Sequence, residues 1–271
     1  MSADVDPITL AAEIGRARAA GRTLPVPFSA RDPLTLAEAY AVQHEVTAAR
    51  LARGERIVGW KLGYTSEVMR EQMGIDAPNF GPLTDAMLLA NGAAVPATAL
   101  QPRVEPEIGL RFARPVPLDA SIPEILDACD GAYACLEVVD SVWRDYRFTL
   151  EDNTADGSSA AWVVVGPELP LDDLAGIEVE LSVDGASVAT GRGADADGHP
   201  AAGAAWLAQQ LATHDRAIEP GDLVITGGLT RAVPLPAEGW IRATFHVAGH
   251  LLASVDVRHR GSTPRPIRSG R

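Results

Sequence analysis

Two apolar runs of this chain carry glutamates at positions where a strand normally buries its side chains. The first run, Gln101–Phe112, contains Glu105 and Glu107, and the second, Ala132–Val139, contains Glu137. Side chains alternate between the two faces of a strand, so Glu105 and Glu107 are expected on one face. Burying a carboxylate is costly unless it is paired or binds a metal ion. The pattern therefore predicts either a solvated edge strand or a carboxylate site for a hard divalent cation such as Mg²⁺.

Pro106 lies between the first two glutamates and favours an edge strand or a bulge, because proline has no backbone N–H to donate. On Glu105 and Glu107 alone, the solvated edge is the stronger interpretation, since exposed acids are common. Glu137 and the motifs described below favour the buried site.

The N-terminal part of the chain has helical patterning. Helices are expected over Ile8–Ala19 and Leu36–Arg53, and Thr35 and Glu38 form a capping box at the start of the second one. Further helices are expected over Ile122–Ala128, after another capping box, and from Pro200 through Leu211.

The remaining apolar segments are short and separated by turn residues. Asn91-Gly92 and Asp184-Gly185 are strong hairpin signals. The order of elements predicts an α+β fold, with a helical N-terminal region on a mostly β body, and not a doubly wound sheet. The expected strands are Ile57–Leu62, Met87–Ala90, Ala93–Val95, Gln101–Phe112, Ala132–Val139, Ala161–Val165, Ile177–Val183, Ala186–Thr190, Leu223–Thr226, Trp240–Val247 and Leu251–Val257.

The domain organisation follows from the same pattern. We expect an N-terminal helical region over 1–80, a β-rich catalytic body over 81–260 and a frayed basic tail over 261–271. The net charge of −13 argues against nucleic-acid binding, which needs a basic surface. No apolar run approaches transmembrane length, and the N-terminus has no hydrophobic signal core. With only two cysteines there is neither a disulfide framework nor a zinc cluster, and a cytoplasmic location is the default.

Three polar features could carry chemistry. Lys61, among apolar strand residues, either faces a ligand cavity, with a lowered pKa or an anionic partner, or is an edge lysine that discourages aggregation. The loops Asn153–Ser159 and Thr226–Arg231 could offer hydroxyls and backbone N–H groups to a carboxylate, or could be ordinary turns. Arg231 could hold a carboxylate through two hydrogen bonds. The histidines form no metal-binding pair, and no Gly-x-Ser-x-Gly motif supports a serine nucleophile.

Seven segments together, in order and with matching spacing from about residue 25 to 257, resemble one known family. The chain is similar to the 2-keto-4-pentenoate hydratases and 4-oxalocrotonate decarboxylases, which belong to the fumarylacetoacetate hydrolase superfamily. The segments are Ala39–Gln43, Val58–Ser66, Pro78–Gly81, Pro102–Ile108, Leu136–Ser141, Thr154–Ser159 and Thr226–Pro234.

The resemblance implies a fold, a metal and a substrate site. It implies a mixed β-sandwich or rolled barrel with an N-terminal helical region, assembled as a homo-oligomer. It also implies Mg²⁺ or Mn²⁺ near a small 2-oxo or 2-hydroxydienoic acid. The residues concerned are Glu105, Glu107 and Glu137 as metal ligands, Lys61 and Asp156 as catalytic residues, and Asn79, Ser159, Thr230 and Arg231 as substrate-binding residues.

The departures from the family pattern concern proton transfer. Asn79 stands where relatives commonly have an aspartate, and an amide cannot act as an acid or base. Gly157, Ser158 and Ala160 replace the Asn, Ala and second Ser of the usual Ala-Asp-Asn-Ala-Ser-Ser motif. These departures leave the predicted metal ligands unchanged, but they leave undetermined which substrate is used and which group is the general base.

The predicted activity is the addition of water to a 2-hydroxy-2,4-dienoate, giving a 4-hydroxy-2-oxo acid, with the divalent ion as Lewis acid. The first alternative is decarboxylation of 4-oxalocrotonate, whose second carboxylate would need a further cation such as Arg231 at the far end of the pocket. The second alternative is a non-catalytic partner subunit, which would have no need of Lys61 and three glutamates in its core. Hydrolysis of a C–C bond would need a Glu/His pair on a lid, and the chain has no such motif.

Overall fold

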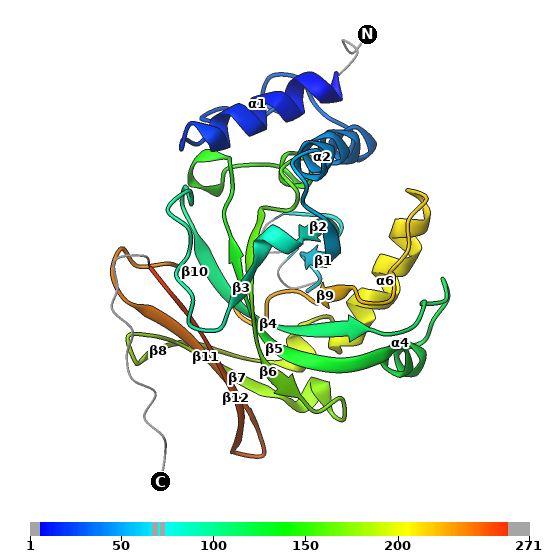
Figure 1. The fold of residues 1–271 in the computed structure, drawn as a ribbon, viewed down its shortest axis with the longest axis vertical. Helices are drawn as coiled ribbons and strands as arrows, with labels where there is room; N and C mark the ends of the chain where they lie inside the picture. The colour runs from blue at the N-terminus through cyan, green and yellow to red at the C-terminus, as the bar shows by residue number, and fades with distance from the viewer. Residues whose placement is uncertain (1–5, 67–69, 71–73, 260–271) are drawn as a thin grey trace.

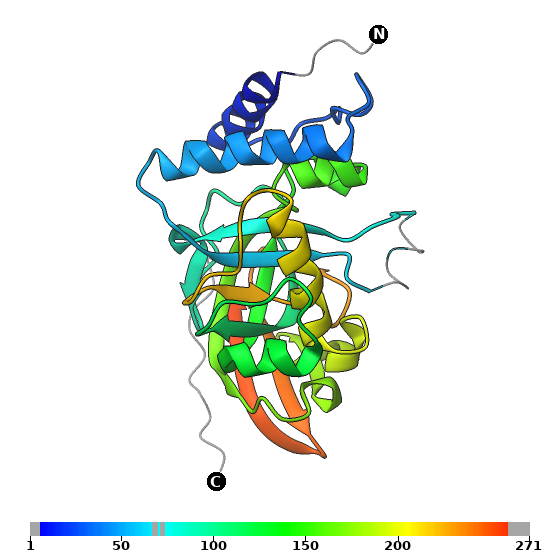
Figure 2. The ribbon, with the colours of Figure 1, turned by 90° about the vertical axis from the view of Figure 1, so that its right-hand side faces the viewer.

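The structure is a computed structural model that describes residues 6–66, 70 and 74–259, so the predicted tail over 261–271 lies outside the described residues. Two β-sheets make up the body, and the N-terminal helices lie together at one end of it (Figures 1 and 2). The predicted α+β class, with a helical N-terminal region on a β body, is confirmed. No helix within the described part of the chain is long and apolar enough to span a membrane.

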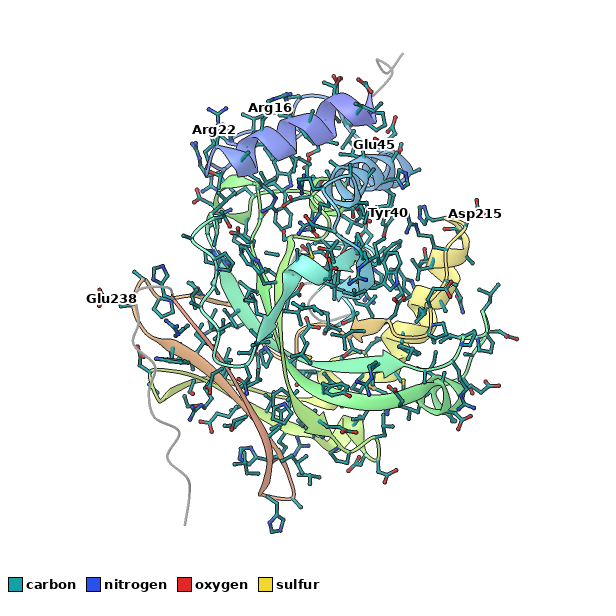
Figure 3. The ribbon with its side chains drawn as sticks, in the orientation of Figure 1. Arg16, Arg22, Tyr40, Glu45, Asp215 and Glu238 are labelled. Carbon is teal, nitrogen blue, oxygen red and sulfur yellow. The ribbon has the colours of Figure 1, made fainter. Side chains whose placement is uncertain are left out.

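The two N-terminal helices form as their capping residues predict. Helix α1 (Pro7–Ala19) begins at Asp6, whose side chain accepts a hydrogen bond from the backbone N–H of Ile8. Helix α2 (Leu36–Leu51) begins with the predicted Thr35–Glu38 capping box. Helix α2 packs on α1 and on the short helix α5 (Leu150–Ala155), which the sequence did not predict. Tyr40 lies on the side of α2 that faces the β body (Figure 3).

The larger sheet is mixed and contains the glutamate strands at its centre. Its strand order is β2-β1-β9-β4-β5-β6-β3, and β10 pairs with β4 beside β9. The strands are β1 (Ile57–Gly63), β2 (Asn79–Thr84), β3 (Leu88–Ala90), β4 (Arg103–Phe112), β5 (Cys129–Val139), β6 (Ala160–Leu169), β9 (Leu223–Ile225) and β10 (Val233–Pro234).

The smaller sheet is antiparallel, in the order β12-β11-β7-β8, and its strand β12 packs against β5 and β6. Leu136 of β5 and Phe245 of β11 are both fully buried in the main core. Helix α6 closes the same core with the buried Leu207. The elements are β7 (Glu178–Val183), β8 (Ala186–Arg192), β11 (Trp240–Val247), β12 (His250–Arg258), α4 (Ile122–Ala128) and α6 (Pro200–Ala212).

The hairpin predicted at Asn91-Gly92 is wrong. Strand β3 pairs in parallel with β6, and the segment after the turn forms only an isolated bridge between Ala94 and Arg258. The Asn91 side chain accepts a hydrogen bond from the backbone N–H of Asp256 and donates one to the carbonyl of Ser254. The turn is therefore held against β12, and this contact replaces pairing between its own flanks. The hairpin predicted at Asp184-Gly185 is confirmed as β7–β8.

The interpretation of the glutamate segment as an edge strand is also wrong. Strand β4 pairs with β5 along its length and, on its other side, with β10 at Val104 and with β9 from Gly109 onward. Pro106 lies in the gap between β10 and β9, where its carbonyl accepts a hydrogen bond from Leu229 of the connecting loop. The proline is tolerated because no ladder partner needs an N–H at this position.

Candidate metal centre and active site

The pairing of β4 with β5 brings the three predicted metal ligands together. Glu105 lies directly opposite Glu137 in the antiparallel register, and Glu107 follows on the same face of β4. One carboxylate oxygen from each of the three lies within 4.8 Å of the others. Glu107 and Glu137 are fully buried, and Glu105 is partly exposed. The cluster combines the donor type and convergence that a hard divalent cation requires.

Some of these carboxylate oxygens have no hydrogen-bond partner in the protein. The backbone N–H of Gly227 donates to Oε2 of Glu107 over 2.9 Å. Within the described residues, Oε1 of Glu107 and Oε1 of Glu137 have no hydrogen-bond partner, and Oε2 of Glu137 has only the ammonium group of Lys61 beside it. Buried and unpaired anionic oxygens are strongly destabilising. A bound cation would satisfy them, so the donor set fits a divalent metal ion.

The pKa values of the three glutamates reflect a shortage of positive charge around them. Burial, followed by the charge of Glu137, raises the pKa of Glu105 to about 8. Burial and the charges of Glu137 and Glu105 raise the pKa of Glu107 well above its ordinary value. Burial also raises the pKa of Glu137, although the neighbouring Lys61 opposes this. Without a cation the cluster therefore retains protons at neutral pH, and metal binding would release them.

Lys61 projects into the site from β1, which lies inside the sheet between β2 and β9. Its Nζ atom lies 3.1 Å from Oε2 of Glu137 and donates to the carbonyl and hydroxyl of Ser158 over 3.0 and 3.3 Å. Burial lowers the pKa of Lys61, but the charges of Glu137, Glu105 and Glu107 outweigh burial and raise it. Both the edge-lysine interpretation and the lowered pKa are therefore wrong, and Lys61 is a buried cation.

The loop between β9 and β10 reaches the glutamates because two of its residues are glycines. Gly227 has a φ of +102°, which L-residues rarely adopt, and this conformation directs its N–H at Glu107. A Cβ atom on Gly228 would lie 2.4 Å from Oε2 of Glu105. The loop is fixed to β4 by hydrogen bonds from Thr226 to Ile108 and from Leu229 to Pro106.

A cavity of about 310 Å³ opens above the cluster, and Lys61 and Glu105 are among its lining residues. Three of the predicted substrate-binding residues, Ser159, Thr230 and Arg231, also line it. Its size suits a small organic acid.

Sequence reasoning missed Arg103, Tyr64 and Tyr146 among the lining residues. Arg103 shares the face of β4 with the glutamates, and its guanidinium lies 4.2 Å from the ring centre of Tyr146. Side chains on one face of a strand recur every two residues, and Arg103 precedes Glu105 by two. The sequence therefore already placed Arg103 on the face of the glutamates. No pattern marks Tyr146, because a short 3-10 turn brings it to the pocket.

Asn79 lies behind the pocket wall instead of lining it. Its amide donates to Asn153 and Thr154, both over 2.9 Å, and its carbonyl oxygen accepts from the hydroxyl of Ser158. Ser158 and Ser159 both have positive φ, near +55°, where non-glycine residues are uncommon. The amide network therefore supports an unusual backbone turn that presents Ser159 to the pocket.

Asp156 points away from the pocket. One of its carboxylate oxygens accepts a hydrogen bond from Arg18 of α1 over 2.7 Å, and the other accepts one from the backbone N–H of Val142 over 2.8 Å. Asp156 is absent from the residues that line the cavity. Its position does not support the predicted catalytic role and instead ties the serine turn to the N-terminal helix.

Comparisons with known proteins agree with this geometry. Residues 56–252 match the family described as fumarylacetoacetate (FAA) hydrolase, C-terminal. A 2-keto-4-pentenoate hydratase of Burkholderia vietnamiensis is 37% identical over 262 residues, covering 94% of this chain and 99% of the relative. A 4-oxalocrotonate decarboxylase of a Pseudomonas species (strain CF600) is 35% identical over 209 residues, covering 74% of this chain and 78% of the relative.

A solved structure extends the agreement to the fold. The 4-oxalocrotonate decarboxylase of Pseudomonas putida G7, in complex with magnesium and adipate, superposes with a TM-score of 0.87. The two chains are 31% identical, and the match covers 93% of this chain and 97% of the other. The resemblance predicted from the ordered motifs and the predicted fold type are therefore confirmed. Curated relatives divide between hydratases and decarboxylases at similar identity.

Proposed function

This chain belongs to the fumarylacetoacetate hydrolase family, and we propose that it is a lyase dependent on Mg²⁺ or Mn²⁺. The proposed reaction adds water to a 2-hydroxy-2,4-dienoate of the 2-keto-4-pentenoate type and gives a 4-hydroxy-2-oxo acid. The 37% identity to a hydratase of this name over nearly the full length of both chains supports the proposal.

The observation that carries the proposal is the convergence of three carboxylates beside the pocket, with Oε1 of Glu107 and Oε1 of Glu137 left unpaired among the described residues. Glu105, Glu107 and Glu137 would hold the ion. When bound, the ion would supply Lewis-acid stabilisation of negative charge on the oxygens of a 2-oxo acid. Arg103 and Arg231, both on the pocket wall, would attract the substrate carboxylate.

The protein's own groups account for positioning and proton transfer. Ketonisation of the dienol places a proton on C5, after which water adds its hydroxyl at C4 and its proton at C3. Lys61, held as a cation, stabilises charge on the substrate oxygen and can relay a proton. Burial and the charges of Glu105 and Glu137 raise the pKa of Tyr64, so its hydroxyl remains a donor.

A second candidate, decarboxylation of 4-oxalocrotonate, is favoured by the two arginines. Arg103 and Arg231 both line the cavity, and a dicarboxylate needs a cationic group away from the reacting end. The similar decarboxylase of known structure is complexed with adipate, which is itself a dicarboxylate. In this reaction the electron pair of the broken C5–C6 bond would pass through the conjugated C3=C4 double bond to the C2 carbonyl oxygen, which would take up a proton as CO₂ leaves.

A paired assay distinguishes the two candidates. The purified protein with Mg²⁺ or Mn²⁺ is offered 2-hydroxypenta-2,4-dienoate in one reaction and 4-oxalocrotonate in the other. We expect water addition without CO₂ release in the first reaction and no turnover in the second. Rapid CO₂ release from 4-oxalocrotonate would establish the second candidate, and absence of turnover in both would refute the lyase assignment for these substrates.

Two glutamate variants separate the metal site from general charge effects. Glu107→Gln should abolish turnover together with Mn²⁺ binding measured by paramagnetic resonance. Glu180→Gln, on an exposed position of β7, should change neither. We also propose that the chain assembles as a homo-oligomer, which light scattering of the purified protein would test.

A further inference from the structure

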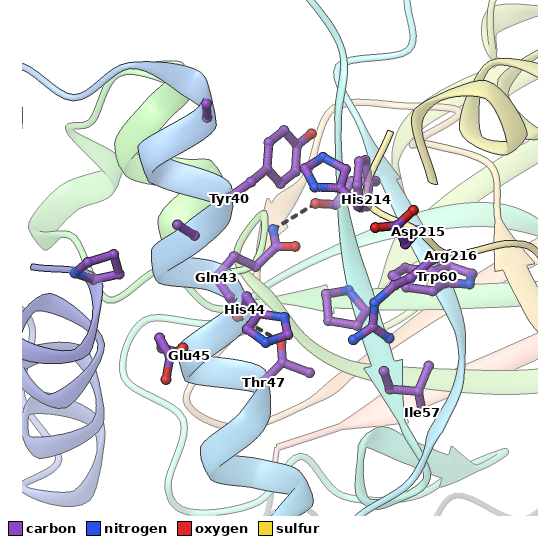
Figure 4. A pocket seen from close by; sticks show the side chains of 15 residues that line it. Tyr40, Gln43, His44, Glu45, Thr47, Ile57, Trp60, His214, Asp215 and Arg216 are labelled. Carbon is purple, nitrogen blue, oxygen red and sulfur yellow. Dashed lines mark hydrogen bonds between the residues drawn. The ribbon is translucent and has the colours of Figure 1, made fainter. Parts of the chain in front are cut away.

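A second and larger cavity, of about 770 Å³, lies on the opposite side of strands β1 and β2 from the glutamates. Helix α2, these two strands and the segment after α6 form its walls (Figure 4). Side chains alternate across each strand. Lys61 faces the metal cluster while the adjacent Trp60 faces this cavity, and Asn79 lies behind the serine turn while Phe80 faces the cavity. The cavity is therefore distinct from the candidate active site.

The inner wall of the cavity is aromatic. Tyr40 stacks on Phe80 with ring centres 4.7 Å apart, and Trp60 meets Phe80 edge to face at 5.9 Å. Each of these three residues is at least nine-tenths buried in the core, and each also lines the cavity. His214 extends this surface at the rim, 4.9 Å from Tyr40. The parts of these rings that reach the cavity give it an apolar aromatic wall, against which a flat ligand can pack.

A single arginine supplies a cationic group at the rim of this cavity. The Arg216 guanidinium lies over the ring of Trp60, 5.9 Å from its centre. Among the described residues, no carboxylate lies within ion-pair distance of Arg216, whereas Arg18 and Arg242 are both paired. A half-buried guanidinium without an anionic partner is suited to hold a carboxylate through two hydrogen bonds.

Further polar groups limit the charge of a ligand. Glu45 and Asp215 also lie at the edge of the cavity and would repel a second negative charge. Burial and the charge of Arg216 lower the pKa of His214, so the imidazole is neutral at pH 7 and adds no second cation. In Figure 4, the Arg216 side chain reaches into the space between Trp60 and the α2 side chains.

We propose that this cavity is a binding site for a small planar aromatic monocarboxylate. The ring system would pack against Tyr40, Trp60 and Phe80, and its carboxylate would pair with Arg216. The volume lies within the range of about 300 to 1,000 Å³ that is typical of small-molecule sites. The proposal concerns a site separate from the metal centre and does not depend on the reaction catalysed there.

Calorimetric titration of the full chain with 2-naphthoate, in the presence of Mg²⁺, tests the proposal. Arg216→Met should weaken binding by at least about tenfold, because it removes the anion partner. Ala41→Phe, which fills the cavity without changing charge, should also abolish binding. Arg103→Met is the matched control, since Arg103 is likewise a half-buried arginine stacked on an aromatic ring, but it lines the other pocket.

Ligand analogues test the chemical class. Neutral 2-naphthol should bind at least about tenfold more weakly, since it cannot pair with Arg216, and cyclohexanecarboxylate should also be weaker, because it is not planar. Binding that persists in folded Arg216→Met and Ala41→Phe proteins would overturn the proposal, as would binding abolished by Arg103→Met. Absence of 2-naphthoate binding to the unmodified protein at millimolar concentration would also overturn it.

Discussion

Two buried acidic clusters lie on either side of the serine turn, and they differ in how their oxygens are satisfied. Among the described residues, the glutamate cluster leaves Oε1 of Glu107 and Oε1 of Glu137 without a hydrogen-bond partner, and Lys61 is the one cation beside it. In the second cluster, Asp140 accepts from the backbone of Leu100 and Gln101, and Asp156 accepts from Arg18 and Val142. The contacts are 2.7 to 3.1 Å long.

The difference follows from where each carboxylate lies in the fold. Glu107 and Glu137 project from central strands, whose backbone N–H groups are already committed to ladder hydrogen bonds. Asp140 and Asp156 follow β5 and α5 directly, where loop N–H groups are available. The single cation of Lys61 does not balance three carboxylates on central strands, so this cluster needs an external cation, whereas the cluster at element ends is satisfied by the chain itself. The comparison distinguishes a ligand site from a structural one.

The largest expected effect comes from breaking the glutamate cluster. Glu107→Gln removes one anionic ligand, so we expect metal affinity to fall by more than ~100-fold, beyond the loss typical of outer-shell changes. The metal-free variant should be at least as stable as the parent, because the amide replaces a buried carboxyl group that is costly to ionise. Mn²⁺ titration and chemical unfolding in chelator measure the two effects. A metal-free variant that is clearly less stable would mean that Glu107 is structural.

A smaller effect is expected from breaking the second cluster. Arg18→Met leaves Asp156 without its cationic partner and should lower the free energy of unfolding by about 2–3 kcal/mol. We expect a smaller loss of unfolding free energy than for a fully buried ion pair, because 28% of the Arg18 side chain is exposed. Arg192→Met, which breaks an exposed pair with Glu178, should cost at most about 1 kcal/mol. Equal losses in urea unfolding would contradict the structural role of Arg18.

The pH dependence of the metal-free protein should show the glutamate cluster directly. The folded protein binds protons at Glu105 up to a pKa of about 8, above the ordinary value of 4.5. Because the folded state then binds more protons than the unfolded state, stability should fall as pH rises from about 4.5 to about 8. The melting temperature in chelator should drop by a few degrees across this interval.

Mg²⁺ provides the control for this pH effect. Burial also raises the pKa values of Asp140 and Asp156, although Arg18 opposes it, so part of the slope has another origin. Saturating Mg²⁺ should remove only the glutamate contribution, because the bound ion favours the ionised carboxylates. Identical pH profiles with and without Mg²⁺ would show that the cluster does not bind the ion.

The smallest expected effect is that of Asp156→Asn. The amide oxygen can still accept from Val142, and only the charge opposite Arg18 is lost, so we expect a destabilisation of about 1 kcal/mol. Metal affinity should stay within about twofold, since Asp156 does not belong to the glutamate cluster. A large drop in Mn²⁺ affinity with unchanged stability would remove the distinction between the two clusters.

Capping boxes and strand alternation made much of the fold predictable from the sequence. Helix α2 begins at Thr35 as its local pattern requires, and Glu105 and Glu107 share a face because of the two-residue period. Arg103 was equally accessible to that reasoning and was missed. Tyr146 and the turn at Asn91 were not accessible, because Tyr146 reaches the pocket through a short 3-10 turn and Asn91 bonds β12, more than 160 residues away.

The sequence by itself determined which side chains share a strand face, because this depends only on the geometry of neighbouring residues. It therefore placed Glu105 and Glu107 together, and the family resemblance of the ordered motifs added Glu137, Lys61 and the glycine loop to the same site. Only the tertiary structure decided which carboxylates remain unpaired. That outcome depends on which distant backbone N–H groups and cations lie beside them. Arg18 lies beside Asp156, whereas within the described residues Oε1 of Glu137 has no donor and Oε2 has only Lys61. The same packing decided that the backs of β1 and β2 form an aromatic cavity beneath Arg216.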